Sequence, residues 1–342
     1  MQIGKRSIGP AFPPLIIAEL GINHGGDLRV AKRMVELAAK SGAECIKHQT
    51  HFVDDEMTED AKLIMPPNAT KSIWDVISES ALTPTAELEL KRYAESLGLI
   101  YLSTPFSRKA VDFLDDAGVL AFKIGSGEAD NIPFLRHVVS KGRPIIMSTG
   151  MQSIESLKES IGVLEDSGVE YALLECTNLY PSPPEHVSLK GIASLAENFP
   201  NAVVGFSDHS IGPEIALASV ALGASIVERH FTDSKYRLGP DIACSMDPSE
   251  LRYLVDKANL VFAALQSEKT RTMPEEDVYR FARGSVVSDR DLNPGDIIRE
   301  SDIWVRRPGD GELKPSDFYK VIGRKVLKNI SKNKQLSWSD FE

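Results

Sequence analysis

Two histidines follow neighbouring apolar runs in the second half of the chain. His209 comes shortly after the run 203–206, and His230 ends the run 225–230. The segment 214–222 between them has the composition of a helix. Because two strands joined by one helix run parallel, their carboxyl ends open on one face and bring both imidazoles to the same rim. Two neutral imidazoles there could bind a borderline divalent cation, or each could be a hydrogen-bonded structural residue.

Polar side chains also end most of the other apolar runs. Lysines and hydroxyls that converge with glycine backbone amides would make a pocket for an anion, and a carboxylate beside lysines stays ionised and could act as a general base. The alternative is that the lysines pair with the acids or reach toward solvent. These strand-end residues are Glu19, Lys47, Gln49, Thr104, Lys123, Ser126, Glu128, Ser148, Thr149, Thr177, Asn178, Tyr180, Ser207, His209 and His230. Asp241 follows the last strand and could bind a polyhydroxy substrate or cap a turn.

An alternation of buried strand and amphipathic helix must position these residues. We predict strands over 15–20, 44–50, 99–104, 121–128, 144–150, 171–177, 203–206 and 225–230. Helices are predicted over 28–41, 84–97, 108–117, 132–140, 153–167, 189–198, 214–222 and 248–266. About eight such units are the count and size of an α/β fold of the (β/α)₈ TIM-barrel type. A doubly wound open sheet could also hold the pattern, but no G-x-G-x-x-G sequence follows the first strand.

Three segments depart from that alternation. Residues 51–82 are too many for an ordinary strand-to-helix connection, and we interpret them as a lid or substrate loop. We place a catalytic barrel domain at 1–267, a polar linker at 268–280 and a small, mostly-β domain at 281–342, with strands over 285–287, 303–305 and 325–327. That last domain has 12 basic and 10 acidic residues, whereas the whole chain has a net charge of −10. About 60 residues are marginal for independent stability, so we expect it to dock on its own barrel or on a partner's.

Composition restricts the partners and the compartment. The acidic balance of 49 acidic against 39 basic residues argues against binding to nucleic acid or to an anionic membrane. The three cysteines, Cys45, Cys176 and Cys244, lack metal-site spacing and are typical of reduced thiols in a cytoplasm. We find no signal peptide and no apolar run long enough to cross a bilayer.

The strand-end motifs together resemble those of the bacterial sialic acid synthases (N-acetylneuraminate synthases). The motifs are 19–24 (ELGINH), 47–51 (KHQTH), 103–106 (STPF), 123–128 (KIGSGE), 148–151 (STGM), 207–209 (SDH) and 228–232 (ERHFT). The tail, with 304–309 (WVRRPG), is similar to the C-terminal antifreeze-like (SAF) domain of that family. The resemblance covers essentially the whole chain.

The resemblance implies condensation of phosphoenolpyruvate with open-chain N-acetylmannosamine and water, giving N-acetylneuraminate and phosphate by C–O cleavage. It implies a divalent metal on His209 and His230 (Mn²⁺, with Mg²⁺ or Co²⁺ as alternatives) and Glu19 acting on the attacking water. Phosphoenolpyruvate would contact Lys47, Thr104, Lys123, Ser126, Ser148, Asn178 and Ser207, and Glu128 also matches the motif of the substrate site. The sugar would contact Gln49, Asn68, Tyr180 and Asp241. It further implies a homodimer in which each SAF domain caps the partner's barrel and brings Arg307 and Phe281 to the sugar.

Other functions fit parts of the pattern. Close relatives of this family make legionaminic or pseudaminic acid from a 6-deoxy diacetamido sugar. Another phosphoenolpyruvate-dependent synthase would need a second phosphate pocket, and no arginine-rich strand end supplies one. A Schiff-base aldolase could use Lys47 or Lys123. A carbohydrate- or ice-binding protein would not need the complete set of strand-end residues. Glu175 stands where the family often has His and alters the local charge.

Overall fold

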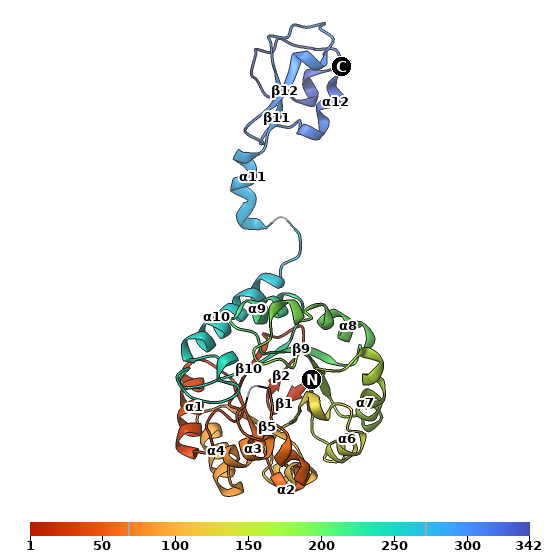
Figure 1. Cartoon of the computed structure of the whole chain (residues 1–342). Coiled ribbons are helices and arrows are strands. Elements are labelled where there is room, and N and C mark those ends of the chain that lie inside the picture. Colours follow the sequence, from red (N-terminus) through yellow and green to blue (C-terminus); the bar gives the residue numbers. More distant parts are fainter. Residues whose placement is uncertain (68, 271) are drawn as a thin grey trace. The chain divides into compact units, whose positions relative to one another are not determined.

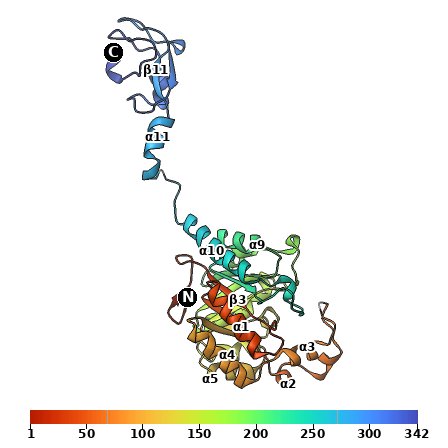
Figure 2. The same cartoon turned by 90° about the vertical axis from the view of Figure 1, so that its left-hand side faces the viewer.

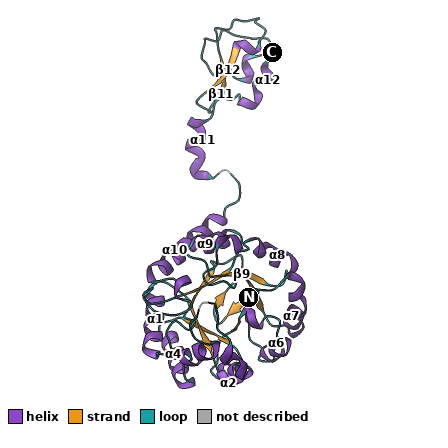
Figure 3. Ribbon diagram, in the orientation of Figure 1, coloured by secondary structure: helices purple, strands orange, loops and turns teal. Residues whose placement is uncertain are grey.

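Eight parallel strands close into a barrel in the first part of the chain (Figures 1 and 3). The computed structural model describes residues 1–67, 69–270 and 272–342, which form two units, Met1–Gln266 and Ser267–Glu342. The barrel strands, in spatial order, are β10 (Ile226–His230), β3 (Leu15–Glu19), β4 (Cys45–Thr50), β5 (Ile100–Pro105), β6 (Phe122–Ile124), β7 (Ile145–Ser148), β8 (Tyr171–Cys176) and β9 (Val203–Asp208). The prediction of a (β/α)₈ barrel is therefore confirmed.

A helix follows each strand of the barrel and covers its outer surface (Figure 1). These helices are α1 (Leu28–Lys40), α4 (Pro84–Ser96), α5 (Arg108–Asp116), α6 (Ile132–Val139), α7 (Ile154–Ser167), α8 (Lys190–Asn198), α9 (Glu214–Ala221) and α10 (Pro248–Leu265). Most begin where a side-chain oxygen accepts a hydrogen bond from the first turn, as Asp27, Thr83, Ser107 and Ser153 do. Such caps satisfy backbone N–H groups that the helix itself leaves unpaired, and they fix where each loop at the barrel mouth ends.

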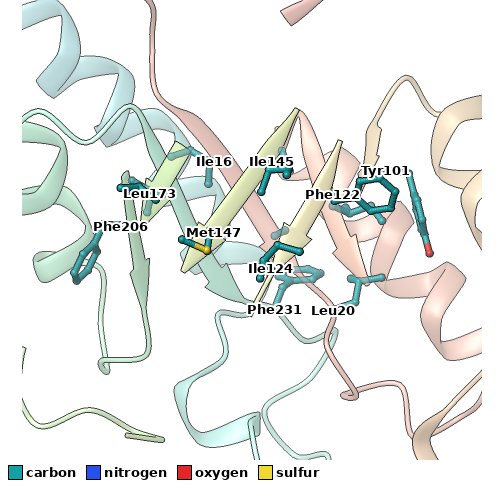
Figure 4. Close-up of a cluster of buried hydrophobic side chains, with 14 of the residues drawn as sticks. Ile16, Leu20, Tyr101, Phe122, Ile124, Ile145, Met147, Leu173, Phe206 and Phe231 are labelled. Atoms are coloured by element: carbon teal, nitrogen blue, oxygen red, sulfur yellow. The ribbon is translucent and has the colours of Figure 1, made fainter. Parts of the chain in front are cut away.

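Strand alternation separates an apolar core from the polar mouth. Side chains that point outward, including Phe122, Met147 and Phe206, pack in the layer between strands and helices (Figure 4). Side chains that point inward start as apolar residues, such as Ile17 on β3 and Ile146 on β7. Two residues further along each strand the inward residues become polar. The same two-residue period that builds the barrel wall therefore places the polar side chains inside one end.

A short hairpin before the first barrel strand closes the opposite end of the barrel. β1 (Gln2–Ile3) pairs antiparallel with β2 (Arg6–Ser7), and Ile3 and Ile8 pack against Leu15 and the inward apolar layer. In Figure 2 the N-terminus and the segment that holds α2 (Val53–Glu56) and α3 (Ile73–Ser80) lie at opposite ends of the barrel. Strands of two residues show no periodicity, so this hairpin could not be predicted from the sequence.

Two predicted segments differ from the structure of the barrel. The strand predicted over 121–128 ends at Ile124, because the N–H of Glu128 donates to the carbonyl of Gly125 and closes the 3₁₀ helix η2 (Ser126–Glu128). The described part of the excursion 51–82 is not a simple loop. It contains α2 (Val53–Glu56), the 3₁₀ helix η1 (Glu59–Leu63) and α3 (Ile73–Ser80).

The second unit folds around its own small core. β11 (Ser285–Ser288) and β12 (Ile303–Arg306) form an antiparallel pair. Phe318 and Val321 of α12 (Phe318–Val321) pack in one apolar cluster with Val286 of β11. The strand predicted over 325–327 is wrong, since Lys325 and Val326 make only isolated bridges. The predicted linker 268–280 contains η5 (Met273–Glu275) and most of α11 (Glu276–Ala282). Within the part of the chain that the structure describes, no helix is long and apolar enough to span a membrane.

Candidate active site

A cavity opens at the carboxyl end of the barrel strands, where barrel enzymes place their chemistry. Most of the predicted site residues line it. The lining residues are Glu19, Lys47, Gln49, Thr104, Phe106, Lys123, Gly125, Ser126, Gly127, Ser148, Cys176, Asn178, Tyr180, Ser207, His209, Glu228, His230 and Asp241. Glu19, Lys47 and Glu228 come from three adjacent strands, because β10 pairs with β3 and β3 with β4.

Two buried lysines and two buried carboxylates meet in the cavity wall. The Nζ atom of Lys47 lies 2.9 Å from an oxygen of Glu19 and 2.9 Å from an oxygen of Glu228. Burial opposes the charge of Lys47, but the two carboxylates outweigh it and raise the pKa of this lysine. Lys123 lies 3.4 Å from Glu228 and donates to the hydroxyl of Ser148 at 2.7 Å. Burial lowers the pKa of Lys123, with repulsion from Lys47 acting in the same direction.

The carboxylate of Glu19 is ionised and fixed in place. Burial favours its neutral form, yet the neighbouring His230 and Lys47 lower its pKa far below the usual range. Lys47 and the side-chain amide of Gln49 each approach its Oε1 atom at 2.9 Å, and Nε2 of His230 lies 3.5 Å from its Oε2 atom. A charged, oriented carboxylate that opens on a cavity can accept a proton from water bound beside it.

Hydroxyl and amide groups surround the lysines. The hydroxyl of Thr104 is buried and has no hydrogen-bond partner within the described residues. The hydroxyl of Ser126 accepts from the backbone N–H of Gly150 at 3.0 Å. A Cβ atom at Gly150 would stand 1.8 Å from the Asn178 side-chain oxygen, so only glycine lets that amide approach. These donors, together with two ammonium groups, suit an anion with several oxygens.

The two predicted metal ligands lie side by side, with ring centroids 5.5 Å apart. Nδ1 of His209 lies 2.8 Å from the Thr177 carbonyl oxygen, so Nδ1 carries a proton, and in the neutral form of the ring the lone pair is on Nε2. Nδ1 of His230 is buried, has no hydrogen-bond partner among the described residues, and lies 3.9 Å from Asp241. Two imidazoles with carboxylates nearby fit a borderline divalent cation. Within residues 1–67, 69–270 and 272–342, no three His, Cys, Asp or Glu side chains form a complete metal site.

Three of the predicted strand-end residues, Glu128, Thr149 and Thr177, do not line this cavity. Three further predicted site residues lie outside the described residues of this unit. Glu128 lies in η2 and lines a neighbouring cavity, where its carboxylate accepts from Asn131. Burial raises the pKa of Glu128. Asn68 lies outside the described residues. Phe281 and Arg307 belong to the second unit, and both are exposed there.

Several lining residues were not predicted as site residues. Glu228 is the most important, because it contacts both lysines and Ser207. Strand alternation could have indicated it, since it stands two residues before His230 and therefore on the same face. Cys176 and Phe106 also line the cavity. Glu175, by contrast, is half-buried on the outside of β8 against Gly191, so its charge does not enter the cavity.

Comparisons with known proteins cover both units. The model of the NeuB family matches residues 34–270, and that of the SAF domain matches residues 283–342. An N,N'-diacetyllegionaminic acid synthase of Campylobacter jejuni is 35% identical over 93% of this chain and 97% of its own length. The N-acetylneuraminate-9-phosphate synthase of Homo sapiens is 34% identical over 96% and 92%. A crystal structure of N-acetylneuraminic acid synthetase from Leptospira borgpetersenii in complex with citrate has a TM-score of 0.75 at 29% identity, over 81% of this chain and 94% of that one.

Proposed function

The chain belongs to the NeuB family, and from that premise we propose that it condenses phosphoenolpyruvate with N-acetylmannosamine and water to give N-acetylneuraminate and phosphate. One observation carries the proposal. A single cavity joins an anion-binding wall around Lys47 and Lys123 to a second wall that holds the two imidazoles and Asp241. The relatives named above are synthases of sugar acids, and the two walls would bring an anionic and a polyhydroxy substrate into contact.

Phosphoenolpyruvate would occupy the wall around the two lysines. Lys47 and Lys123 supply positive charge, and the free hydroxyl of Thr104 supplies a directional donor. Ser126, Ser148, Asn178 and Ser207 complete this wall. Because the lysines are already held by Glu19, Glu228 and Ser148, their positions are set before the substrate arrives, and little reorganisation is needed.

The carbon–carbon bond would form between C3 of phosphoenolpyruvate and the aldehyde carbon of the open-chain sugar. The π bond of the aldehyde breaks, and its oxygen becomes a hydroxyl by taking up the proton that the attacking water releases. Positive charge then develops at C2, and Glu19 accepts a proton from the water whose oxygen adds there. The resulting tetrahedral carbon loses phosphate by cleavage of its C–O bond, so the phosphoryl group leaves with the bridging oxygen. Lys123 and Ser148, which contact each other at 2.7 Å, would stabilise the departing phosphate.

A divalent cation, with Mn²⁺ as our first choice and Mg²⁺ or Co²⁺ as alternatives, would be held by His209 and His230. When bound, it would polarise the sugar aldehyde as a Lewis acid. The unpartnered Nδ1 of His230 and the lone pair left on His209 support the assignment. Water and substrate oxygens would supply the remaining ligands, because the described residues contribute no third one.

The choice of N-acetylmannosamine rests on the wall beside Asp241. A free carboxylate accepts hydrogen bonds from hydroxyls and repels a phosphate, and none of the described residues that line the cavity is an arginine. We therefore favour an unphosphorylated sugar. Synthesis of legionaminic or pseudaminic acid from a 6-deoxy diacetamido sugar is the second candidate, favoured by the 35% identity to the Campylobacter jejuni synthase.

We also propose a homodimer in which each SAF domain covers the partner's barrel. Large apolar side chains are exposed on the loops that follow four consecutive strands, namely Met151, Leu179, Ile211, Tyr236 and Leu238. An apolar rim around a polar cavity is typical of a surface that another protein covers. Arg307 and Phe281 would then reach the sugar in the partner's cavity.

Three buried cysteines without disulfides support our assignment of the enzyme to the cytoplasm.

Phosphate release from phosphoenolpyruvate tests the proposal. Release should require both the sugar and a divalent cation, and comparison of N-acetylmannosamine, its 6-phosphate and the 6-deoxy diacetamido analogue identifies the acceptor. Release that continues without any sugar would reject the condensation. Borohydride trapping with pyruvate should not label Lys47 or Lys123, and labelling would instead favour a Schiff-base aldolase.

A further inference from the structure

His51 lies between the α2 segment and the cavity. Its Nδ1 atom is 2.8 Å from a carboxylate oxygen of Glu56 on α2, and its Nε2 atom is 3.2 Å from the side-chain oxygen of Gln49 on β4. Gln49 in turn donates its amide to Glu19 at 2.9 Å. The ring of His51 is stacked on Phe106, with centroids 4.7 Å apart and planes inclined by 11°. A continuous chain of contacts therefore runs from α2 to Glu19.

The directions of these hydrogen bonds fix the protons on His51. The carboxylate of Glu19 is paired with Lys47 at 2.9 Å and accepts from the NH₂ group of Gln49, so the oxygen of Gln49 faces His51. Nε2 of His51 must then donate. Nδ1 faces the carboxylate of Glu56 and must also donate. Rotation of the Gln49 amide would set its oxygen against a carboxylate, so the alternative assignment fails. Both ring nitrogens therefore carry a proton.

The surroundings of His51 can hold this charge. The carboxylate of Glu56 carries the opposite charge and contacts the ring, and the face of Phe106 attracts a cation. His24, on the loop after β3, is another titratable group near the ring, and Glu128 lines the same neighbouring cavity as Glu56 and Phe106. Burial and the neighbouring His48 lower the pKa of His24 to about 3, so it stays neutral and adds no repulsion. The backbone N–H of Gly26 donates to Nδ1 of His24, which agrees with a neutral ring.

We propose that His51 is a positioning residue, an imidazolium that ties Glu56 on α2 to Gln49 and thereby fixes the orientation of Glu19. The consequence for Glu19 rests on the function proposed above, whereas the hydrogen-bond chain does not. If α2 moves, Glu56 moves with it, His51 loses one acceptor, and the amide of Gln49 is free to rotate away from Glu19. The excursion after β4 would thus control the carboxylate that acts on water.

The protonation of His51 can be measured without any substrate. In ¹⁵N-labelled full-length protein at pH 7.5, the His51 ring is assigned as the signal that disappears in His51→Ala. We expect both of its nitrogens to resonate as protonated, and Glu56→Gln to shift at least one of them toward the unprotonated range. A wild-type ring with one unprotonated nitrogen would overturn the proposal, whatever the enzyme's activity.

Kinetics test the positioning role. We expect His51→Ala to lower kcat by about 10- to 100-fold and to change KM for phosphoenolpyruvate by less than about threefold, since Glu19 acts on water and not on the bound anion. Glu56→Gln, which keeps the shape of the side chain, should lower kcat in the same direction, and adding it to His51→Ala should cause no further loss. His137→Ala is the matched control, because His137 pairs with Asp112 at 2.9 Å away from the cavity. A folded His51→Ala with wild-type kcat would contradict the role.

Discussion

The ammonium group of Lys47 lies 2.9 Å from a carboxylate oxygen of Glu228, on the inner face of the strand that closes the barrel. Glu228 also lies 3.4 Å from Lys123, so one carboxylate holds both cations of the anion-binding wall. All three side chains are buried. Breaking a buried ion pair by removing one charge leaves the other uncompensated.

Glu228→Gln should therefore lower the free energy of unfolding by about 3 kcal/mol, as buried pairs do when one partner is lost. Phosphoenolpyruvate should restore more stability in this variant than in the wild type, because its oxygens replace the missing carboxylate. Thermal unfolding with and without the ligand measures both effects. Lys62→Met is the control, since the exposed pair Lys62–Glu59 contributes at most about 1 kcal/mol. An equal ligand effect in both proteins would refute this role for Glu228.

His209→Ala and His230→Ala should each abolish metal-dependent phosphate release, because we propose that the two imidazoles together hold the cation. Chelation of the wild type should have the same effect, with recovery on adding Mn²⁺. Binding of Mn²⁺ measured by calorimetry should be lost in either variant. Full activity of either variant would end the assignment.

Gly150→Ala should weaken phosphoenolpyruvate binding by about tenfold or more, because overpacking at a rigid site costs about 1–3 kcal/mol. The added methyl would collide with the Asn178 amide and with the Ser126 hydroxyl. Gly162→Ala provides a contrast, since nothing lies within 4 Å of a Cβ at that position in α7. It should leave binding unchanged and raise stability slightly through helix propensity. Calorimetric titration of both variants compares them directly.

Glu175 should make stability fall as pH rises. Burial raises the pKa of this half-buried carboxyl from 4.5 to about 7, so the folded protein binds its proton more tightly than the unfolded chain does. Its favourable contribution is complete below about pH 4.5 and is lost as pH rises through about 7, by at most about 3 kcal/mol. Glu175→Gln should remove that slope in urea unfolding measured from pH 4 to 8. The carboxyl of Glu165 shows the opposite sign, because hydrogen bonds from Asn201 and Tyr171 lower its pKa.

Arg307→Ala should raise KM for the sugar more than KM for phosphoenolpyruvate, because we place this residue beside the sugar in the partner's cavity. Steady-state kinetics with each substrate varied in turn give the two values. Lys334→Ala, another exposed cation of the second unit, should change neither. An equal effect of Arg307→Ala on both substrates would argue against the capping role.

The barrel and most of the cavity could be predicted because inward and outward side chains alternate along each strand. Lys47 and Gln49 alternate with outward residues on β4, and placing polar residues at strand ends was enough to bring them together. Alternation could have indicated that Glu228 points into the barrel, but its contacts with Lys47 and Lys123 depend on strands that lie far apart in the sequence. Such contacts have no signature in the local sequence.

Two predicted strand segments were wrong because the sequence of a strand resembles that of another local structure. Residues 126–128 have the apolar neighbours of a strand, but one backbone hydrogen bond from Glu128 to Gly125 turns them into a 3₁₀ helix. That turn also moves Glu128 out of line with Lys123 and toward the neighbouring cavity. In the second unit, Val326 has the composition of a strand residue but bridges only to Phe341. In a small unit with few neighbours, composition cannot tell a strand from an isolated bridge.

The hairpin of Ile3 and Ile8 has a kinetic consequence. It fills the barrel floor with apolar side chains, at the end opposite the cavity. Whatever enters first blocks the path of whatever enters deeper. For the function proposed above, we therefore expect the compound at the lysines to bind before the one at the rim. The order in which compounds bind would then depend on the end of the barrel where no chemistry takes place.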